Sequence, residues 1–331
     1  MKILVVGDGS IGRRHMRNLQ TLPHIQVMAC SSHLRAAPLS GSENFSSLDE
    51  AFDRQPDAVV VANRTSEHLP VALAAASRGC HLLIEKPLSH TLQDIDALKT
   101  MRDHRRLTVM VGCNMRFHPA LRAIREALDE KLLGDVLSVQ VHCGSYLPDW
   151  RPGRDYRSCY SAQRAQGGGV LLDLVHELDY AHWLFGDVQA VSAFLGKRSD
   201  LVIDTEDVAD LLLQFHSGLV AQVHLDYVQR TPSRGCRVVG SDGTVIWSDE
   251  QGHVQLLRPG EPERVLWKRP ADYDRNLMYL EEMHHFVRCV EERVPPLIGL
   301  DDGEAALRIV LAAKASSAEG KVVRVQDVSR S

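Results

Sequence analysis

The stretch that decides the fold is Ile3-Leu-Val-Val-Gly-Asp-Gly-Ser-Ile-Gly-Arg13, near the start of the 331-residue chain. An apolar run typical of a buried strand is followed at once by the spacing G-x-G-x-x-G. In that spacing Gly7 makes a tight turn, Gly9 lets the backbone approach a pyrophosphate, and Gly12 lets the next helix pack on the strand. Free N–H groups at the helix start favour diphosphate oxygens. The stretch therefore predicts a dinucleotide site with contacts from Gly7, Gly9, Ser10, Ile11 and Gly12.

Composition and charge narrow the class of protein. Hydrophobic residues make up 44% and charged residues 24%, which is ordinary for a globular protein. The net charge of −5 provides no field that attracts nucleic acid or an anionic membrane, so we expect neither as a partner. Seven cysteines without a C-x-x-C pair argue against a disulfide framework or structural zinc, and for reduced thiols in a cytoplasmic protein. We also expect no metal site, since no histidines have ligand spacing.

Segments of strand and helix character alternate over the first third of the chain. Apolar strands are predicted at 2–7, 25–30, 58–62, 81–85 and 107–112, with helices between them. This alternation predicts a parallel sheet with helices on both faces, a Rossmann domain covering residues 1–117. Strand-like segments separated by turn signals follow, and they predict an α+β domain over residues 118–331 with a mostly antiparallel, open-faced sheet.

The end of the second strand is expected to recognise the adenosine ribose of the cofactor. NAD-binding proteins carry an acidic residue there, but this chain has Cys30-Ser-Ser-His-Leu-Arg35. Serines and an arginine suit a 2′-phosphate, so Ser31, Ser32 and Arg35 favour NADP over NAD. The alternative is that Arg35 is solvated and the backbone contacts the ribose.

A lysine follows the fourth predicted strand, in the sequence Ile84-Glu-Lys-Pro87. Ligands of an open parallel sheet bind outside the carboxyl ends of its strands, so Lys86 lies at the functional edge. Glu85 could orient the ammonium, which could hydrogen-bond a substrate hydroxyl and hold a developing alkoxide. The alternative is an ordinary surface lysine.

Three glycines, Gly167 to Gly169, open a predicted helix that carries Asp173, His176 and Tyr180. Asp173 and His176 are three residues apart and His176 and Tyr180 are four apart, which places the three side chains on one face of the predicted helix. A histidine near neutrality can take a hydroxyl proton while hydride leaves the carbon. The alternative is a core histidine bonded to a neighbouring aspartate.

The segment 146–157 is rich in arginine and aromatic residues. Arginine binds carboxylate or phosphate groups, and aromatic rings cover the C–H surface of sugars. Trp150, Arg151 and Tyr156 are therefore candidates for holding an anionic, sugar-like substrate. A solvated loop with some packed rings is the alternative.

Together these motifs resemble the Gfo/Idh/MocA oxidoreductases, named for glucose-fructose oxidoreductase and inositol dehydrogenase. The likeness covers nearly the whole chain. It rests on the glycine motif followed by His15, Asn63 to His68, Glu85-Lys86-Pro87, Asn114-x-Arg116-Phe117, and Gly167–Gly169 leading to His176-x-x-Asp179. It implies hydride transfer between NAD(P) and a carbon of a sugar, cyclitol or related polyol, and a homodimer or homotetramer built on the open sheet.

The resemblance also implies the residues of the site. Lys86 and His176 are the implied catalytic groups. The role of Asp173 transfers less safely, because the family's common form puts four steps between aspartate and histidine where this chain has three. Implied cofactor contacts are Asn63, His68, Glu85, Lys86 and Asn114. Substrate contacts are expected from Lys86, Arg116, Trp150, Arg151, Tyr156, Asp173, His176 and Tyr180.

Three functions are compatible with these motifs. The leading one is an NAD(P)-dependent sugar or polyol dehydrogenase or reductase. A non-catalytic sensor of cofactor or sugar could use the same scaffold, although a sensor needs no proton-handling residues. An epimerase or eliminase could recycle the cofactor within one cycle.

Overall fold

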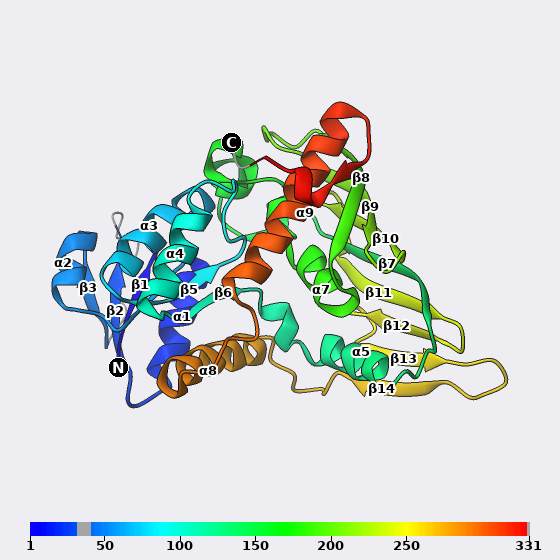
Figure 1. Cartoon of the computed structure of the whole chain (residues 1–331), viewed down its shortest axis with the longest axis horizontal. Coiled ribbons are helices and arrows are strands. Elements are labelled where there is room, and N and C mark those ends of the chain that lie inside the picture. The colour runs from blue at the N-terminus through cyan, green and yellow to red at the C-terminus, as the bar shows by residue number, and fades with distance from the viewer. Residues whose placement is uncertain (32–40, 330–331) are drawn as a thin grey trace. The chain divides into compact units, whose positions relative to one another are not determined.

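The computed structural model describes residues 1–31 and 41–329, so the predicted ribose contacts Ser32 and Arg35 lie outside the described residues. The described chain forms two units (Figure 1). The first unit comprises residues 1–114 and 275–304, and the second comprises residues 115–274 and 305–329. Residues 275–304 thus join the first unit, although they follow the predicted boundary at 117.

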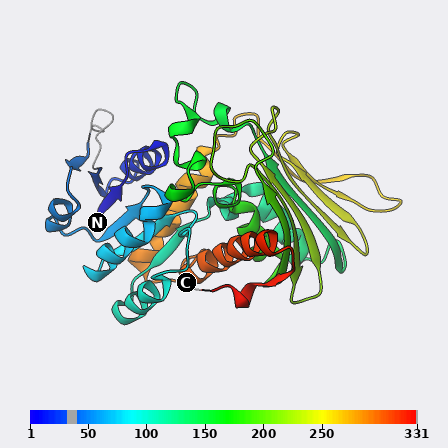
Figure 2. The ribbon, with the colours of Figure 1, turned by 90° about the horizontal axis from the view of Figure 1, so that it is seen from above.

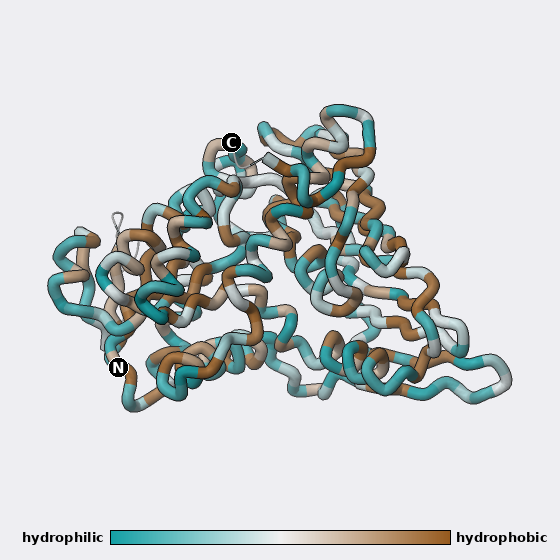
Figure 3. The backbone as a smooth tube through the Cα atoms, viewed as in Figure 1, coloured by the Kyte–Doolittle hydropathy of each residue, from teal (hydrophilic) through white to brown (hydrophobic). Residues whose placement is uncertain are grey.

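The first unit is built on a six-stranded parallel sheet, which confirms the predicted Rossmann fold. The strand order is β3-β2-β1-β4-β5-β6. The strands are β1 (Lys2–Val6), β2 (Gln26–Cys30), β3 (Glu43–Phe45), β4 (Ala58–Val61), β5 (His81–Glu85) and β6 (Val109–Gly112). The central strands are continuous apolar runs because both faces of a parallel sheet are covered (Figure 3). Strand β3 was not predicted, since its three residues include a single apolar side chain.

Helices cover both faces of this sheet. They are α1 (Ser10–Gln20), α2 (Leu48–Asp53), α3 (His68–Ser77), α4 (Ile95–Arg105) and α8 (Asn276–Glu292). The strand order reverses beside β1, so right-handed crossovers put α1 on the opposite face from α3 and α4. Helix α8 packs against α1 (Figure 1). The reversal between β1 and β4 is the place where ligands of such sheets bind.

The second unit is built on a nine-stranded sheet of order β14-β13-β12-β11-β7-β10-β9-β8-β15. Only β7 and β10 pair in parallel, so the predicted, mostly antiparallel sheet is confirmed. The strands are β7 (Val136–Gly144), β8 (Val188–Gly196), β9 (Val208–Phe215), β10 (Val220–Asp226), β11 (Ser233–Gly240), β12 (Thr244–Ser248), β13 (His253–Leu257), β14 (Arg264–Lys268) and β15 (Val323–Arg324).

Helices lie on one face of the nine-stranded sheet. Figure 2 shows α5 (Pro119–Asp129), α7 (His176–Phe185) and the later part of α9 (Leu300–Glu319) on the same side of it. Buried and exposed residues alternate along β9, as expected when one face is covered and the other is open. The open face carries exposed apolar side chains, among them Phe194 at 73% exposure.

The predicted helix 170–185 is interrupted. Helix α6 (Val170–Asp173) ends at Leu174, whose ψ of 30° leaves the helical region, and α7 starts at His176. Asp173 and His176 therefore belong to different helices, and the prediction that they share one helix face is wrong. No helix within the described ranges is long and apolar enough to cross a membrane.

Candidate functional site

The glycine loop between β1 and α1 has the geometry of a diphosphate site. Gly7 has a φ of +113°, a backbone angle that residues with a side chain rarely adopt. A Cβ on Gly12 would overlap the carbonyl oxygen of Gly7, so the helix packs directly on the turn. A Cβ on Gly9 would meet no atom within 4 Å, which leaves this side of the loop open. The loop therefore has room for a ligand where the sequence motif requires it.

The start of α1 is suited to an anion. No side chain caps the helix at Gly9, and its first turn carries no acidic residue. Ser10 is exposed and Ile11 is half-buried at this end. The N–H groups at a helix start carry partial positive charge and seek an acceptor, so the residues present fit the diphosphate of a dinucleotide.

Other predicted cofactor contacts follow neighbouring strands. Ser31 directly follows β2, and its N–H donates to the Phe45 carbonyl at 3.1 Å. Asn63 follows β4 and donates through Nδ2 to Glu67 Oε2 at 3.2 Å. Asn114 follows β6 and is buried. All three lie at the carboxyl ends of strands, the edge at which this fold binds ligands.

Lys86 stands at the carboxyl end of β5 on a backbone held from both sides. Its N–H donates to Glu85 Oε2 at 3.1 Å. On the other side, His68 Nδ1 donates to the Pro87 carbonyl at 2.9 Å. His68 is buried, and burial lowers the pKa of its imidazole. In this structure His68 therefore supports, from the interior, the segment Lys86-Pro87, here called the lysine loop.

Glu85 bonds to more than the lysine. Its Oε1 accepts a hydrogen bond from His15 Nε2 at 2.6 Å. One nitrogen of His15 and one carboxylate oxygen each of Glu85 and Glu282 all lie within 4.8 Å of one another, and no sequence motif predicted this group. Three buried side chains from α1, β5 and α8 thus meet behind the lysine loop.

In the second unit, a polar cluster surrounds Asp173. The Tyr227 hydroxyl donates to Asp173 Oδ2 at 2.5 Å, and Tyr160 also hydrogen-bonds this carboxylate. Burial and the charge of Asp173 raise the pKa of both tyrosines, which therefore stay protonated donors. Tyr160 was missed because its only signal was its place in a polar loop. His176 is the first residue of α7 and is partly exposed.

The predicted substrate loop contributes to this cluster in part. Arg151 lies over the Tyr160 ring, with its Cζ 5.4 Å from the ring centroid. Trp150 donates through Nε1 to Ser145 Oγ at 2.8 Å, and its ring meets that of Tyr227 edge-on at 5.2 Å. Tyr156 instead accepts a hydrogen bond from the Val202 N–H at 3.1 Å. Arg151 and Trp150 therefore border the Asp173 cluster, while Tyr156 ties down the loop.

Two predicted substrate contacts are buried. Arg116 is 2% exposed, and its Nε and Nη2 donate to the two carboxylate oxygens of Asp179 at 3.0 and 2.7 Å. Tyr180 is fully buried, with its ring 6.4 Å from that of Trp247. These positions give both residues a structural role in place of the predicted contact.

The glycines before α6 also differ from expectation. They were predicted to let a ligand approach the helix. A Cβ on Gly168 would overlap the Tyr160 carbonyl, and one on Gly169 would overlap the Glu206 carboxylate. The space beside the glycines is therefore taken by the protein's own chain.

Comparisons with known proteins agree with this geometry. Residues 1–113 match the Gfo/Idh/MocA family model described as an oxidoreductase family with an NAD-binding Rossmann fold, and residues 125–325 match that family's C-terminal α/β domain. Myo-inositol 2-dehydrogenase of Thermotoga maritima is 27% identical over 99% of this chain and 99% of its own. The 1,5-anhydro-D-fructose reductase of Ensifer adhaerens is 28% identical over 91% of each chain. The crystal structure of GenD2 from gentamicin A biosynthesis, in complex with NAD, has a TM-score of 0.84 at 26% identity and covers 98% of this chain and 96% of its own.

Proposed function

Because the chain belongs to the Gfo/Idh/MocA oxidoreductase family, with an NAD-binding Rossmann domain and a C-terminal α/β domain, we propose that it transfers hydride between a nicotinamide cofactor and a carbinol or keto carbon of a sugar or related polyol. Family membership makes it an NAD(P)-dependent oxidoreductase. The sugar class is supported by the relatives named for myo-inositol and 1,5-anhydro-D-fructose. The observation that carries the proposal is the open glycine loop on the same sheet edge as Lys86.

Lys86 is the proposed hydrogen-bond donor to the reacting oxygen. Glu85 and His68 fix the backbone on either side of it, which limits where the ammonium can point. The bound nicotinamide would supply the hydride acceptor or donor. An ammonium at the reacting hydroxyl stabilises the negative charge that develops on the oxygen as its proton leaves. Fixing such a donor in advance is what makes it effective.

His176 is the proposed proton acceptor, since an imidazole can take a hydroxyl proton near neutral pH. Asp173 was predicted as a third catalytic residue. Its hydrogen bonds to Tyr227 and Tyr160 favour a different role, because they hold the carboxylate in a fixed position. We assign Asp173 to positioning and electrostatic support. Arg151 beside this cluster is the proposed partner of an anionic group on the substrate.

The preferred cofactor is proposed to be NADP. No acidic residue follows β2 in the sequence 30–35, and serines with an arginine suit a 2′-phosphate. Comparing kcat/KM for NADP and NAD with one substrate tests this preference. A clear advantage for NAD would reverse it.

Residues 118–331 are proposed to bind substrate and to form a homodimer or homotetramer. The support for assembly is the open sheet face, where Leu137, Phe194, Leu212 and Val220 are exposed. Exposed apolar side chains grouped on one face are typical of an interface. Light scattering after size exclusion measures the assembly. A cytoplasmic location is proposed because the seven cysteines, all among the described residues, form no disulfide.

The experiment that tests the function is Lys86→Met with a panel of free sugars, uronates, sugar phosphates and nucleotide sugars. We expect cofactor binding to persist and turnover to fall by about 10²- to 10⁴-fold. Lys268→Met, at an exposed lysine on β14, is the matched control. Near-normal turnover by Lys86→Met would contradict the role. Substrate conversion without net change in nicotinamide absorbance would indicate internal recycling, and binding without conversion would indicate a sensor.

A further inference from the structure

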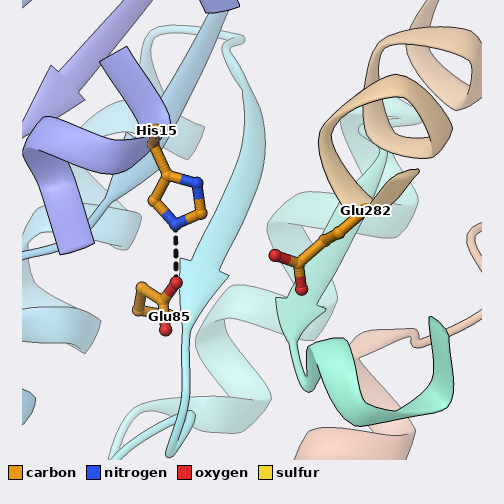
Figure 4. A group of neighbouring side chains, drawn as sticks. All are labelled: His15, Glu85 and Glu282. Carbon is orange, nitrogen blue, oxygen red and sulfur yellow. Dashed lines mark hydrogen bonds and ion pairs between the residues drawn. The ribbon is translucent and has the colours of Figure 1, made fainter. Parts of the chain in front are cut away.

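Three titratable side chains meet in the interior of the first unit (Figure 4). His15 comes from α1, Glu85 ends β5, and Glu282 comes from α8. Glu282 and His15 are fully buried. Figure 4 shows the Glu282 carboxyl group directed toward the other two side chains.

Glu282 differs from its neighbours in its bonding. Glu85 accepts hydrogen bonds from His15 and from the backbone of Lys86. Neither oxygen of Glu282 has a hydrogen-bond partner among the described residues. An ionised carboxylate that is buried without a partner is strongly disfavoured, whereas a protonated carboxyl group carries no net charge.

The geometry favours a proton over a metal ion. His15 Nε2 and Glu85 Oε1 are 2.6 Å apart, which is a charge-assisted hydrogen bond. Two ligands of one tetrahedral zinc ion lie about 3.3 Å apart, given bonds of roughly 2.0 Å. A proton on Glu282 removes the second negative charge from this cluster without a metal ion.

The pKa values of the two carboxyl groups, Glu282 and Glu85, are shifted in opposite directions. Burial raises the pKa of Glu282 well above its usual range, and the charge of Glu85 adds to this. Burial acts the same way on Glu85, but the His15 bond and the nearby positive charges outweigh it and lower the pKa. The titratable and charged groups that surround these two carboxyl groups are Arg14 and His15 of α1, Lys86 after β5, His68 of α3, and Tyr279 of α8.

We infer that Glu282 is a positioning residue for the lysine loop, held as a neutral carboxylic acid so that Glu85 can bind His15 and the Lys86 backbone at once. Loss of its proton would place a second negative charge beside Glu85. Glu85 is the group that holds the Lys86 backbone, so its displacement would move the proposed catalytic ammonium. The inference rests on the proposed role of Lys86.

Infrared spectroscopy of the cofactor-bound protein tests the protonation state directly. Glu282→Gln copies the shape of the neutral acid and cannot ionise. We expect the carbonyl band of a protonated carboxyl group in the wild-type spectrum and its loss in Glu282→Gln. Glu281→Gln, at the adjacent exposed position of α8, is the matched control and should keep the band. Should Glu282→Gln fail to fold, Glu282→Met replaces it, since methionine has similar volume and no proton to lose.

The pH profile of kcat separates positioning from a merely structural role. Wild type should lose kcat about tenfold per pH unit beyond an alkaline limit, as expected for loss of one proton. Glu282→Gln should lack that limb and stay within about threefold of wild type at neutral pH. The inference would be overturned if Glu282→Gln kept the carbonyl band of the wild type, or if it kept the pH profile of the wild type. It would also be overturned if a metal ion copurified with wild type at one ion per chain and was absent from Glu282→Gln. The infrared and metal measurements need no turnover, so they distinguish this failure from failure of the proposed function.

Discussion

The buried ion pair between Arg116 and Asp179 allows a stability effect to be worked out from the structure. Both side chains are buried, and two parallel hydrogen bonds of 2.7 and 3.0 Å join them. Asp179→Asn keeps the shape of the side chain but removes its charge, leaving the guanidinium in the interior without that carboxylate. Removing one partner of a buried pair costs about 3–5 kcal/mol. At about 2–4 °C per kcal/mol for a domain of this size, Tm should fall by roughly 6–20 °C.

The assay is urea unfolding followed by circular dichroism, with calorimetry for Tm. Asp129→Asn is the matched control, because Asp129 is 62% exposed and pairs with Arg125 one helical turn away. Such an exposed pair contributes about 0.3–0.5 kcal/mol. The double variant Arg116→Met with Asp179→Leu should recover part of the loss, since no charge then remains buried at that position. A loss below about 1 kcal/mol in Asp179→Asn would refute this reasoning.

Three further predictions concern the glycine loop, the Asp173 cluster and the nine-stranded sheet. Gly12→Ala should weaken NAD(P) binding at least about tenfold, since the new methyl group would displace the glycine turn; equal affinity in a fluorescence titration would contradict this. Tyr227→Phe removes a donor to the Asp173 carboxylate and should lower kcat/KM about tenfold or more with an unchanged circular dichroism spectrum; an unaffected kcat/KM would separate Asp173 from catalysis. Hydrogen bonds to Asp226 and to a second carboxylate raise the pKa of His224 to about 9. The stabilisation that protonated His224 gives the folded protein is therefore fully present below about pH 6.5 and is lost as the pH rises through 9. Urea midpoints measured from pH 6 to 10 should fall more steeply for wild type than for His224→Gln, and equal slopes would argue against the pair.

The parallel sheet could be predicted because its signal is local. Strand β4 is a continuous apolar run, strands β1 and β5 are apolar except at their ends, and the glycine spacing follows β1. Turn residues marked most of the antiparallel strands in the same way. Where the local signal was weak, as in the three residues of β3, prediction failed.

The site was harder to predict because its contacts join residues far apart in the chain. Asp173 and His176 fitted one continuous helix, yet the Asp173 carboxylate bonds to Tyr227 on a distant strand, and the helix breaks between them. Arg116 has the chemistry of an anion binder, and only its contact with Asp179 identifies it as structural. Glu282 is of a residue type that is usually exposed to solvent on a helix. Its burial depends on how α8 packs, which no local pattern encodes.

The return of α8 to the first unit limits how this protein can be dissected. A fragment ending at residue 117 would contain every strand of the parallel sheet but would expose the side of α1 that carries His15 and Asn18. Asn18 and Asn276 hydrogen-bond each other through their side chains, and Arg14 lies over the Tyr279 ring. Transplanting the nucleotide-binding half into another protein therefore requires residues 275–304 to travel with it, joined by a new linker.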